Sequence, residues 1–323
     1  MSDSFQKHPI VFYNVENLFD TIDDKSLLGN EEFTPEGNKL WDEERYQTKL
    51  NRLAEALMFI NGSTPLAFGM AEIENRKVVE DLIKTGALAQ RDYKIVHYNS
   101  EDRRGMDCAF VYDSKFIQSE LETRLIITVE DEPHFRTRDI IHMKAKIGNN
   151  SIHFFVNHWP SRREGISESE NRRKAAAMTL RREIDELLNA EKNANILVMG
   201  DFNDTPDNYS IKTILRAKGQ HEQTKGDLIN LLIEEHKDGF GTTVHQREWD
   251  IFDQLIVSQG LLQGQSGLEV QGNNAHIAHR KELVFTFKDG GSKPSATYGG
   301  DTYHGGYSDH LPVFLNLKSK QSF

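Results

Sequence analysis

Four apolar segments of this chain, far apart in the sequence, each stand directly beside acidic, amide or imidazole side chains. The segments have the length and composition of buried strands. A carboxylate beside such a strand costs folding free energy unless its charge is paired, so folding alone does not explain the arrangement. The segments and their polar neighbours are 65–71 before Glu72, 152–156 before Asn157 and His158, 195–200 before Asp201 and Asn203, and 311–317 after Asp309 and His310.

The placement of these side chains indicates a shared site. Ligand sites in α/β proteins favour the carboxyl ends of strands. Three of the clusters follow their strand, whereas Asp309 and His310 precede theirs. All four therefore share one edge if that last strand runs antiparallel to the others. A single motif such as Asp201-Phe202-Asn203 is equally typical of a turn, but four motifs with one placement indicate an active site.

The order of the predicted elements limits the fold class. Helices and strands alternate at first and several strands then follow one another, which favours an α/β fold with two packed mixed sheets and helices outside. No repeat or change in composition divides residues 1–323, so we expect a single domain. We expect helices at 42–60, at 76–88 and from a capping box at Ser167–Glu170 to about 190, and strands at 9–14, 65–71, 93–98, 107–112, 124–130, 138–147, 151–157, 195–200, 254–258, 283–287 and 311–317.

Composition excludes several classes of protein. With 37% apolar residues the chain can build a sizeable core, and no apolar stretch approaches the length of a membrane helix. Residues 1–7 lack the apolar core of a signal sequence, which fits a cytoplasmic protein and equally a secreted or periplasmic one whose signal has been removed. The single cysteine, Cys108, excludes internal disulfides, and its strand-like surroundings predict a buried, inert thiol.

The net charge of −11 bears on possible partners. Proteins that hold nucleic acid by its backbone usually carry a basic face, so the charge argues against tight, sequence-independent binding. A bound divalent cation and local arginines can still make a cleft positive within an acidic protein. Nucleic acid or another phosphodiester thus remains possible as a substrate, and nothing in the sequence indicates a protein partner.

The candidate ligand atoms are hard oxygens, which suit Mg²⁺ or Mn²⁺. A structural zinc site is disfavoured by the single cysteine, and we interpret His276 and His279 as residues of a solvated loop. Magnesium held by one or two carboxylates belongs to phosphate-ester chemistry. The candidate oxygen ligands are Asn14, Glu72, Asp201, Asn203 and Asp309.

Two histidines and two arginines complete the candidate set. His158 and His310 could move a proton or hold a phosphate oxygen, and Asp253, which opens an apolar strand, could orient one of them. Arg162, four residues after His158, is the first candidate for a phosphate contact, and Arg104 is the second. Most other arginine clusters, including Arg136 with Arg138, fit a solvated charged face.

Taken in order, these motifs resemble those of the endonuclease/exonuclease/phosphatase superfamily. The opening Asn14-Val15-Glu16-Asn17-Leu18-Phe19-Asp20 and the segment Arg104-Gly105-Met106-Asp107 resemble most closely its bacterial secreted-nuclease branch. The resemblance extends from residue 9 to 317. The motifs that carry it are Asn14 in Phe12-Tyr13-Asn14-Val15-Glu16-Asn17, Glu72, Asn157-His158, Gly200-Asp201-Phe202-Asn203, Asp253 and Ser308-Asp309-His310.

The resemblance implies a four-layer α/β sandwich and hydrolysis of a phosphoester by in-line attack of water. It implies that Glu72, helped by Asn14 and Asp309, holds the metal. It further implies the following roles: Asp201 orients or deprotonates the water, Asn203 contacts the scissile phosphate, His310 oriented by Asp253 stabilises the charge of the transition state, and His158 assists the leaving oxygen or the phosphate.

Three points stay open in the sequence. The first acidic motif reads Ala71-Glu72-Ile73-Glu74, so Glu74 is a rival metal ligand. The resemblance favours a Mg²⁺-dependent phosphodiesterase, most simply a nuclease. The alternative is a phosphomonoesterase or a hydrolase of lipid or inositol phosphate head groups. The sequence shows neither the dense set of basic residues expected of an inositol phosphatase nor the exposed aromatic hairpin expected of a lipid hydrolase. A binding module without activity is disfavoured because all the motif residues are present.

Overall fold

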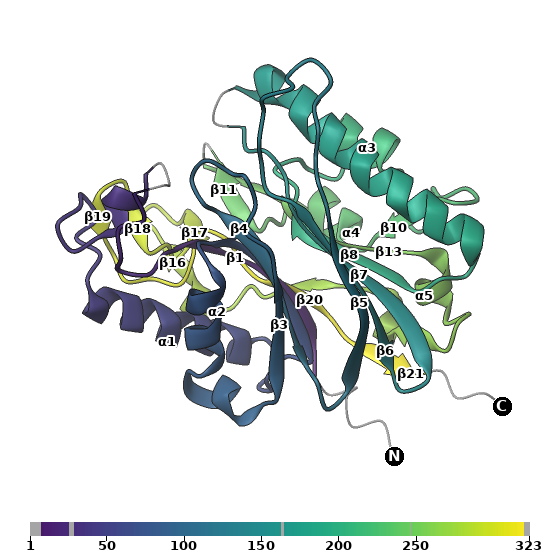
Figure 1. The fold of residues 1–323 in the computed structure, drawn as a ribbon, viewed down its shortest axis with the longest axis horizontal. Coiled ribbons are helices and arrows are strands. Elements are labelled where there is room, and N and C mark those ends of the chain that lie inside the picture. Colours follow the sequence, from purple (N-terminus) through teal and green to yellow (C-terminus); the bar gives the residue numbers. More distant parts are fainter. Residues whose placement is uncertain (1–7, 26–28, 163–164, 246, 320–323) are drawn as a thin grey trace.

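Two mixed β-sheets lie face to face at the centre of the computed structural model, which describes residues 8–25, 29–162, 165–245 and 247–319 (Figure 1). The signal-segment prediction for residues 1–7 falls outside this range. One sheet has the strand order β15-β20-β1-β2-β4-β3 and the other β5-β6-β7-β8-β13-β10-β9. The strands of the first sheet are β15 (His276–Ile277), β20 (Val313–Leu315), β1 (Ile10–Leu18), β2 (Ala67–Ile73), β4 (Asp107–Asp113) and β3 (Tyr93–His97). Those of the second are β5 (Ile117–Leu125), β6 (Ile140–Ile147), β7 (Asn150–His158), β8 (Ile196–Asp201), β13 (Asp253–Val257), β10 (Leu228–Asn230) and β9 (Ala217–Lys218).

Both faces of the central strands are buried, which explains their nearly continuous apolar sequences. Along β1, Ile10 and Phe12 belong to the core between the sheets, whereas Val11 and Tyr13 belong to the core on the outer face. The inner core joins residues of both sheets, as in the contact of Phe110 with Phe154, whose ring centroids are 4.9 Å apart.

Helices cover the two outer faces, so the molecule has four layers. The helices α1 (Glu43–Phe59) and α2 (Arg76–Ile83) pack on the first sheet. The long α3 (Ile166–Ala190) packs on the second through Ala176, Leu180 and Ile184, and Figure 1 shows it on the opposite side of the molecule from α1. The predicted four-layer α/β sandwich is confirmed.

Strand directions bring the polar ends together. β1 pairs in parallel with β2, and β7 with β8. β20 runs antiparallel to β1, and β13 antiparallel to β8. The carboxyl ends of β1, β2, β7 and β8 therefore share one edge with the amino ends of β20 and β13, as expected for an antiparallel last strand.

Several predicted boundaries are wrong. The strand expected at 124–130 is β5, which ends at Leu125. β5 lies at a sheet edge and is mostly exposed, so its sequence lacks an apolar pattern, while Ile127 and Val129 beyond it pack on α3 without forming a strand. The helix expected at 76–88 ends at Ile83 and is followed by a 3₁₀ turn, Gly86–Gln90.

Two local predictions also need correction. α3 begins at Ile166 with Gly165 as its N-cap, so no capping box forms at Ser167. His276 is exposed as expected but lies in the short strand β15 instead of a loop. Cys108 is buried as predicted, and burial raises the pKa of its thiol well above the ordinary value.

Smaller elements connect the main strands. The hairpins are β11 (Thr243–His245) with β12 (Glu248–Asp250), β16 (Val284–Thr286) with β17 (Ser292–Pro294), and β18 (Tyr298–Gly299) with β19 (Thr302–Tyr303); β14 (Leu268–Val270) pairs with β21 (Leu317–Ser319). The remaining helical turns are Asn30–Phe33, Ser210–Ile214, α4 (Ile233–Lys237), α5 (Gln259–Gln263), Gln271–Asn273 and Lys281–Leu283.

Candidate active site

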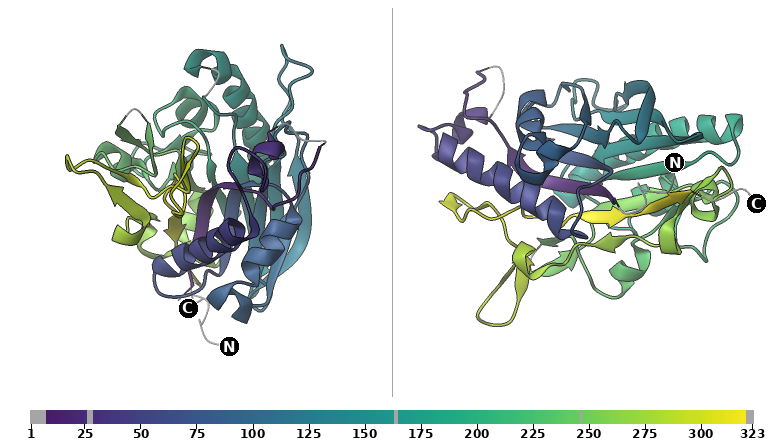
Figure 2. Two further views of the ribbon diagram at one scale, coloured as in Figure 1. Left: turned by 90° about the vertical axis from the view of Figure 1, so that its left-hand side faces the viewer. Right: turned by 90° about the horizontal axis from the view of Figure 1, so that it is seen from below.

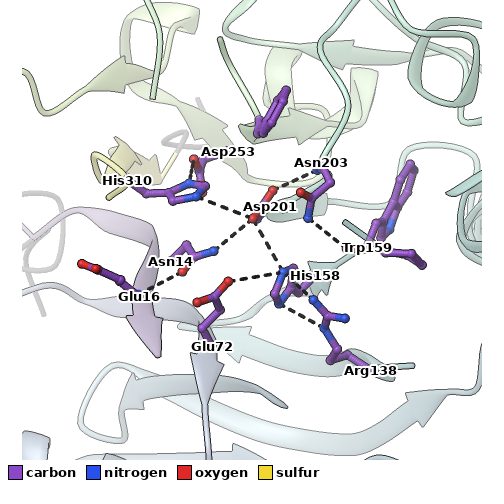
Figure 3. Close-up of polar contacts among 12 residues, drawn as sticks. Asn14, Glu16, Glu72, Arg138, His158, Trp159, Asp201, Asn203, Asp253 and His310 are labelled. Atoms are coloured by element: carbon purple, nitrogen blue, oxygen red, sulfur yellow. Dashed lines mark hydrogen bonds and ion pairs between the residues drawn. The ribbon is translucent and has the colours of Figure 1, made fainter. Parts of the chain in front are cut away.

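Asp201, at the end of β8, is the centre of a buried polar cluster (Figure 3). It is 2% exposed, and its carboxylate accepts hydrogen bonds from Asn14 Nδ2 at 3.0 Å and from the backbone N–H of Asn203 at 2.9 Å. Desolvation raises the pKa of Asp201 to about 6, and Asp253 adds to this shift, whereas His310 and the two hydrogen bonds oppose it. A carboxylate with such a pKa can accept a proton near neutral pH.

His310 lies on one side of Asp201 and is fixed by Asp253. Its Nδ1 is 2.6 Å from Asp253 Oδ2, and its Nε2 is 4.0 Å from Asp201 Oδ2. Burial alone lowers the pKa of His310, but the charge and hydrogen bond of Asp253, with Asp201 and Asp309, outweigh burial and hold the pKa well above its ordinary value. These neighbours favour the protonated ring, and its Nε2 faces the centre.

The chain around Thr242 holds this pair in place. The hydroxyl of Thr242 accepts hydrogen bonds from the backbone N–H groups of Phe252 and Asp253, at 3.2 Å each. The carbonyl of Thr242 accepts from the N–H of Leu311 at 2.7 Å. One short segment thus aligns Asp253 with His310.

His158 lies on the other side of Asp201. Its Nε2 is 3.7 Å from Asp201 Oδ2 and 4.0 Å from Glu72 Oε1. The guanidinium group of Arg138 lies within hydrogen-bond distance of both ring nitrogens, at 3.2 and 2.8 Å. Arg138 is itself anchored by Asp102 Oδ2 at 3.1 Å.

The backbone is strained where several site residues stand. Glu16, Asn17, Glu72 and Asn203 all have φ between 50° and 63°, a left-handed conformation that non-glycine residues rarely adopt. Glu72 interrupts the pairing of β2 with β4 as a bulge, and its Oε2 accepts the N–H of Asn17 at 3.0 Å. Bulges commonly redirect a side chain beside a functional site.

Asp309 has acidic neighbours in Glu16 and Glu72. Desolvation by the surrounding protein raises the pKa of Asp309 to about 7, and the charges of Glu16 and Glu72 add to the shift. Asp309 is also exposed to solvent, so water moderates the effect. The contributions of Glu16 and Glu72 mean that acids lie close together at this edge, and a cation held by their hard oxygens would relieve the repulsion.

Lys49, a buried residue of α1, contacts Glu16 and the segment that precedes Asp309. It is 1% exposed, and its Nζ donates to Thr297 Oγ1 at 2.6 Å and to the carbonyl of Tyr307 at 2.8 Å. Its Nζ is also 3.9 Å from Glu16 Oε2, and Glu16 in turn accepts the backbone N–H of Thr297 at 2.6 Å. The buried ammonium group of Lys49 therefore fixes the position of the segment from Thr297 to Tyr307, which leads to Asp309.

A different grouping has the geometry to hold a cation. Ligand atoms of Asp201, Asp253 and His310 all lie within 4.8 Å of one another. However, Asp253 and His310 already hydrogen-bond to each other through atoms 2.6 Å apart. This contact argues against a cation shared by the two residues, and a cation at Glu72, Asn14 and Asp309 stays a prediction.

Glu74, the rival of Glu72, is turned away from the cluster. Its carboxylate accepts the N–H of Asp20 at 2.8 Å and Asn30 Nδ2 at 2.6 Å. Desolvation raises the pKa of Glu74 to about 7. These contacts give Glu74 a structural task, which is to hold the loop after β1.

The two predicted phosphate contacts differ in position. Arg162 donates to the carbonyl of Asn203 at 2.7 Å and, through Nη2, to Asp204 and Asn208. Its donors thus support the Asn203 turn. Arg104 lines a groove beside Arg138. Phosphate binding by either arginine remains a prediction.

Sequence reasoning misses Arg138 and Lys49. The sequence indicates a solvated face for Arg138, but the residue is 5% exposed and contacts His158. The signal is present, because Arg138 stands just before the apolar strand β6, as Asp253 stands at the start of β13. Lys49 lies on the apolar stripe of α1, and its position there is a signal of the same kind.

The chain is similar to known proteins in sequence profile and in fold. Residues 9–319 match the profile of the Endonuclease/Exonuclease/phosphatase family. No curated protein sequence matches the chain. Among the described residues, no helix combines the length and apolar character needed to cross a membrane.

Solved structures share the fold. An endonuclease/exonuclease/phosphatase from Bacteroides vulgatus has a TM-score of 0.59 at 14% identity, covering 97% of this chain and 99% of that one. The Bacteroides thetaiotaomicron mannosyl-6-phosphatase Bt3783 has a TM-score of 0.58 at 15% identity, covering 96% and 99%. D. rerio TDP2 complexed with a single-strand DNA product has a TM-score of 0.55 at 12% identity, covering 96% and 98%. At these sequence identities the comparison shows a shared fold and nothing further.

Proposed function

The chain belongs to the endonuclease/exonuclease/phosphatase family, and on that premise we propose that it is a metal-dependent phosphodiesterase that hydrolyses nucleic acid. The observation that carries the proposal is the buried Asp201, held by Asn14 and Asn203 between the imidazoles of His158 and His310. This arrangement places a proton acceptor between two groups that can stabilise negative charge.

Each residue of the cluster has a task in this proposal. Asp201 orients the attacking water and accepts its proton, which its raised pKa favours. His310, kept cationic by Asp253, stabilises the negative charge that develops on the phosphate oxygens. His158 assists the leaving oxygen or the phosphate from the opposite side, and Asn203 contacts the scissile phosphate.

Glu72, Asn14 and Asp309 would hold the cation, with Mg²⁺ or Mn²⁺ as the candidates. When bound, such an ion supplies charge neutralisation for the phosphate and a template that orients it. Glu16 and Lys49 support these ligands from within the protein and would not contact the substrate.

A substrate panel tests the proposal. We expect purified protein with Mg²⁺ to hydrolyse plasmid DNA or RNA and the diester bis-p-nitrophenyl phosphate, and to hydrolyse the monoester p-nitrophenyl phosphate more slowly. The single-strand DNA product complexed with D. rerio TDP2, a protein of the same fold, supports the choice of a diester. Hydrolysis of the monoester alone would overturn the assignment as a diesterase.

A phosphomonoesterase or a head-group hydrolase is the second candidate, and two observations favour it. One structural neighbour is named a mannosyl-6-phosphatase. In addition, no exposed aromatic hairpin is expected from the sequence, but the structure contains one: Phe285 and Phe287 on the β16–β17 hairpin are 50% and 41% exposed. Figure 2 shows this yellow-green hairpin projecting from the body of the molecule.

Apolar residues at a projecting tip, with Lys288 and Lys293 nearby, suit contact with a lipid surface. Vesicles that contain a phospholipid substrate discriminate the two candidates. The second candidate predicts that Phe285→Ser with Phe287→Ser slows hydrolysis in vesicles while bis-p-nitrophenyl phosphate is hydrolysed as before. Equal rates on vesicles before and after the substitution would remove the support that the hairpin gives it.

A further inference from the structure

A groove with five arginines adjoins the candidate active site. Its walls are the segment 102–104, the loop 131–138 between β5 and β6, and Pro160, Ser161 and Arg172 near the start of α3. In Figure 1 the β5–β6 loop extends above the sheets beside the first turns of α3. We call this feature the arginine groove.

The arginine groove borders the His158 side of the cluster. Arg138 lines the groove and also lies 2.8 Å from His158 Nε2. Pro160 and Ser161 line it too, directly after Trp159, whose carbonyl accepts Asn203 Nδ2 at 3.0 Å. Figure 3 shows Arg138 and Trp159 on the side of Asp201 opposite His310 and Asp253. A polymer whose scissile phosphate lies at Asp201 would therefore extend towards the groove on the His158 side.

The groove is a positive region on an acidic protein. Its lining has five arginines against three carboxylates, Asp102, Asp131 and Glu132, and Arg136 also pairs with Glu101 beside the lining at 2.5 Å, which leaves a balance of +1 on a chain with a net charge of −11. Two carboxylates are engaged by arginines: Asp102 by Arg138 at 3.1 Å, and Glu132 by Arg172 at 2.7 Å. The side chain of Arg103 is exposed on the groove. A local excess of arginine attracts phosphate even when the whole protein is acidic.

The groove also offers a surface for a planar group. Phe135 is half-buried in the lining, and the guanidinium carbon of Arg172 lies 4.3 Å from the centre of its ring. Aromatic rings and guanidinium planes that accompany a positive groove bind unpaired bases by stacking. Bases inside a duplex are already stacked on each other, so this surface favours a single strand.

We propose that the arginine groove binds the part of a single-stranded nucleic acid that continues beyond the scissile phosphate. The inference rests on the proposed function, because it assumes that the scissile phosphate lies at Asp201. Arg103 and Arg104 hold the backbone phosphates, and Phe135 with Arg172 stacks a base. The substrate is then a polymer that fills both the site and the groove.

Direct binding tests the groove without requiring activity. Fluorescence anisotropy in EDTA compares a labelled dinucleotide, a single strand of about 12 nucleotides and the same sequence as a duplex. We expect the longer single strand to bind most tightly. Arg103→Ala with Arg104→Ala should weaken its binding about tenfold and reduce the slope of log affinity against log salt by about 1.4, which is two lost phosphate contacts.

The matched control removes the same charge elsewhere. Arg182 and Lys192 are exposed at α3 and just after it, outside the groove lining, and Arg182→Ala with Lys192→Ala should weaken binding much less. Phe135→Leu, which keeps apolar bulk but removes the ring, should weaken binding of single strands several-fold regardless of sequence. Equal weakening by the groove and control pairs would overturn the proposal, as would a duplex binding as tightly as the single strand or an affinity independent of length.

Hydrolysis separates this proposal from the proposed function. If the groove variant loses more kcat/KM on the oligonucleotide than on bis-p-nitrophenyl phosphate, both stand. If the protein hydrolyses no phosphodiester but the groove variant still loses single-strand binding, the groove stands and the proposed function fails. If diesters are hydrolysed and the groove variant binds the oligonucleotide normally, the groove fails alone.

Discussion

At the scale of single residues, the Asp253–His310 pair leads to a quantitative expectation. The two side chains are 0% and 10% exposed and joined at 2.6 Å. His310→Ala should lower kcat by a factor of at least ~10², the range for lost charge stabilisation or proton transfer. Asp253→Asn should be nearly as damaging, because it removes the charge that keeps His310 cationic.

A double-mutant cycle measured by steady-state kinetics checks whether the pair acts as a unit. We expect the variant with both substitutions to be no slower than the worse single variant. Large effects that multiply would show that Asp253 has a task apart from His310.

Glu72 and Glu74 give the second prediction. Glu72→Gln should raise the Mg²⁺ concentration needed for half-maximal activity sharply, because the carboxylate near His158 loses its charge. Glu74→Gln should leave that concentration within a few-fold. Titration of Mg²⁺ against activity measures both, and the reverse ranking would move the metal to Glu74.

The stability cost of Glu74→Gln is larger than the sequence indicates. As a charge near a helix end, Glu74 would contribute at most ~1 kcal/mol. In the structure it is 6% exposed and accepts two hydrogen bonds. Losing one of these acceptors in a buried position costs about 1–3 kcal/mol, which urea denaturation can measure.

At the scale of elements, a histidine pair makes the β6–β7 contact sensitive to acid. His142 Nε2 lies 2.9 Å from His153 Nδ1, and both residues are buried. Burial lowers the pKa of His142 to about 3 and that of His153 to about 4, and the proximity of His153 adds to the shift of His142. The unfolded chain, with ordinary values near 6.5, therefore binds more protons than the folded protein below that pH.

The sign of the pH dependence follows from this difference. The contribution of the two histidines to the free energy of unfolding should be constant above pH ~6.5. It should fall as the pH decreases towards 4, by on the order of 2 kcal/mol per histidine. Urea denaturation across this range measures it. His142→Gln with His153→Gln should flatten the profile, whereas His221→Gln, at an exposed position, should not. An unchanged slope in the double variant would exclude the pair as its source.

The elements show what a sequence pattern can predict. Strands buried on both faces, such as β1 and β8, are continuous apolar runs, and the sequence predicts their positions within a few residues. The exposed edge strand β5 has no such run. Ile127 and Val129 have the apolar alternation of a strand in the sequence, but they pack on α3 outside any strand. Polar residues at strand ends predict most of the side chains that meet around Asp201, but the Arg138 and Lys49 contacts depend on tertiary packing between distant segments.

At the scale of the whole molecule, the two sheets explain why residues from 14 to 310 meet. Parallel pairing of β1 with β2 and β7 with β8, and antiparallel pairing of β20 and β13 with their neighbours, place every cluster at one edge. The motif order predicts that meeting. The sequence cannot show the arginine groove, because its walls come from three separate segments.

Hydrolysis of phosphodiesters at this edge depends, in our proposal, on a divalent cation and on Asp201. The most direct test is the hydrolysis of bis-p-nitrophenyl phosphate by the wild-type protein and by Asp201→Asn, each with EDTA and then with added Mg²⁺ or Mn²⁺. We predict that the wild-type protein is inactive in EDTA and active with the cation. Asp201→Asn, folded by circular dichroism, should be slower by a factor of at least ~10². Full wild-type activity after exhaustive chelation, or undiminished activity of Asp201→Asn, would contradict the proposal.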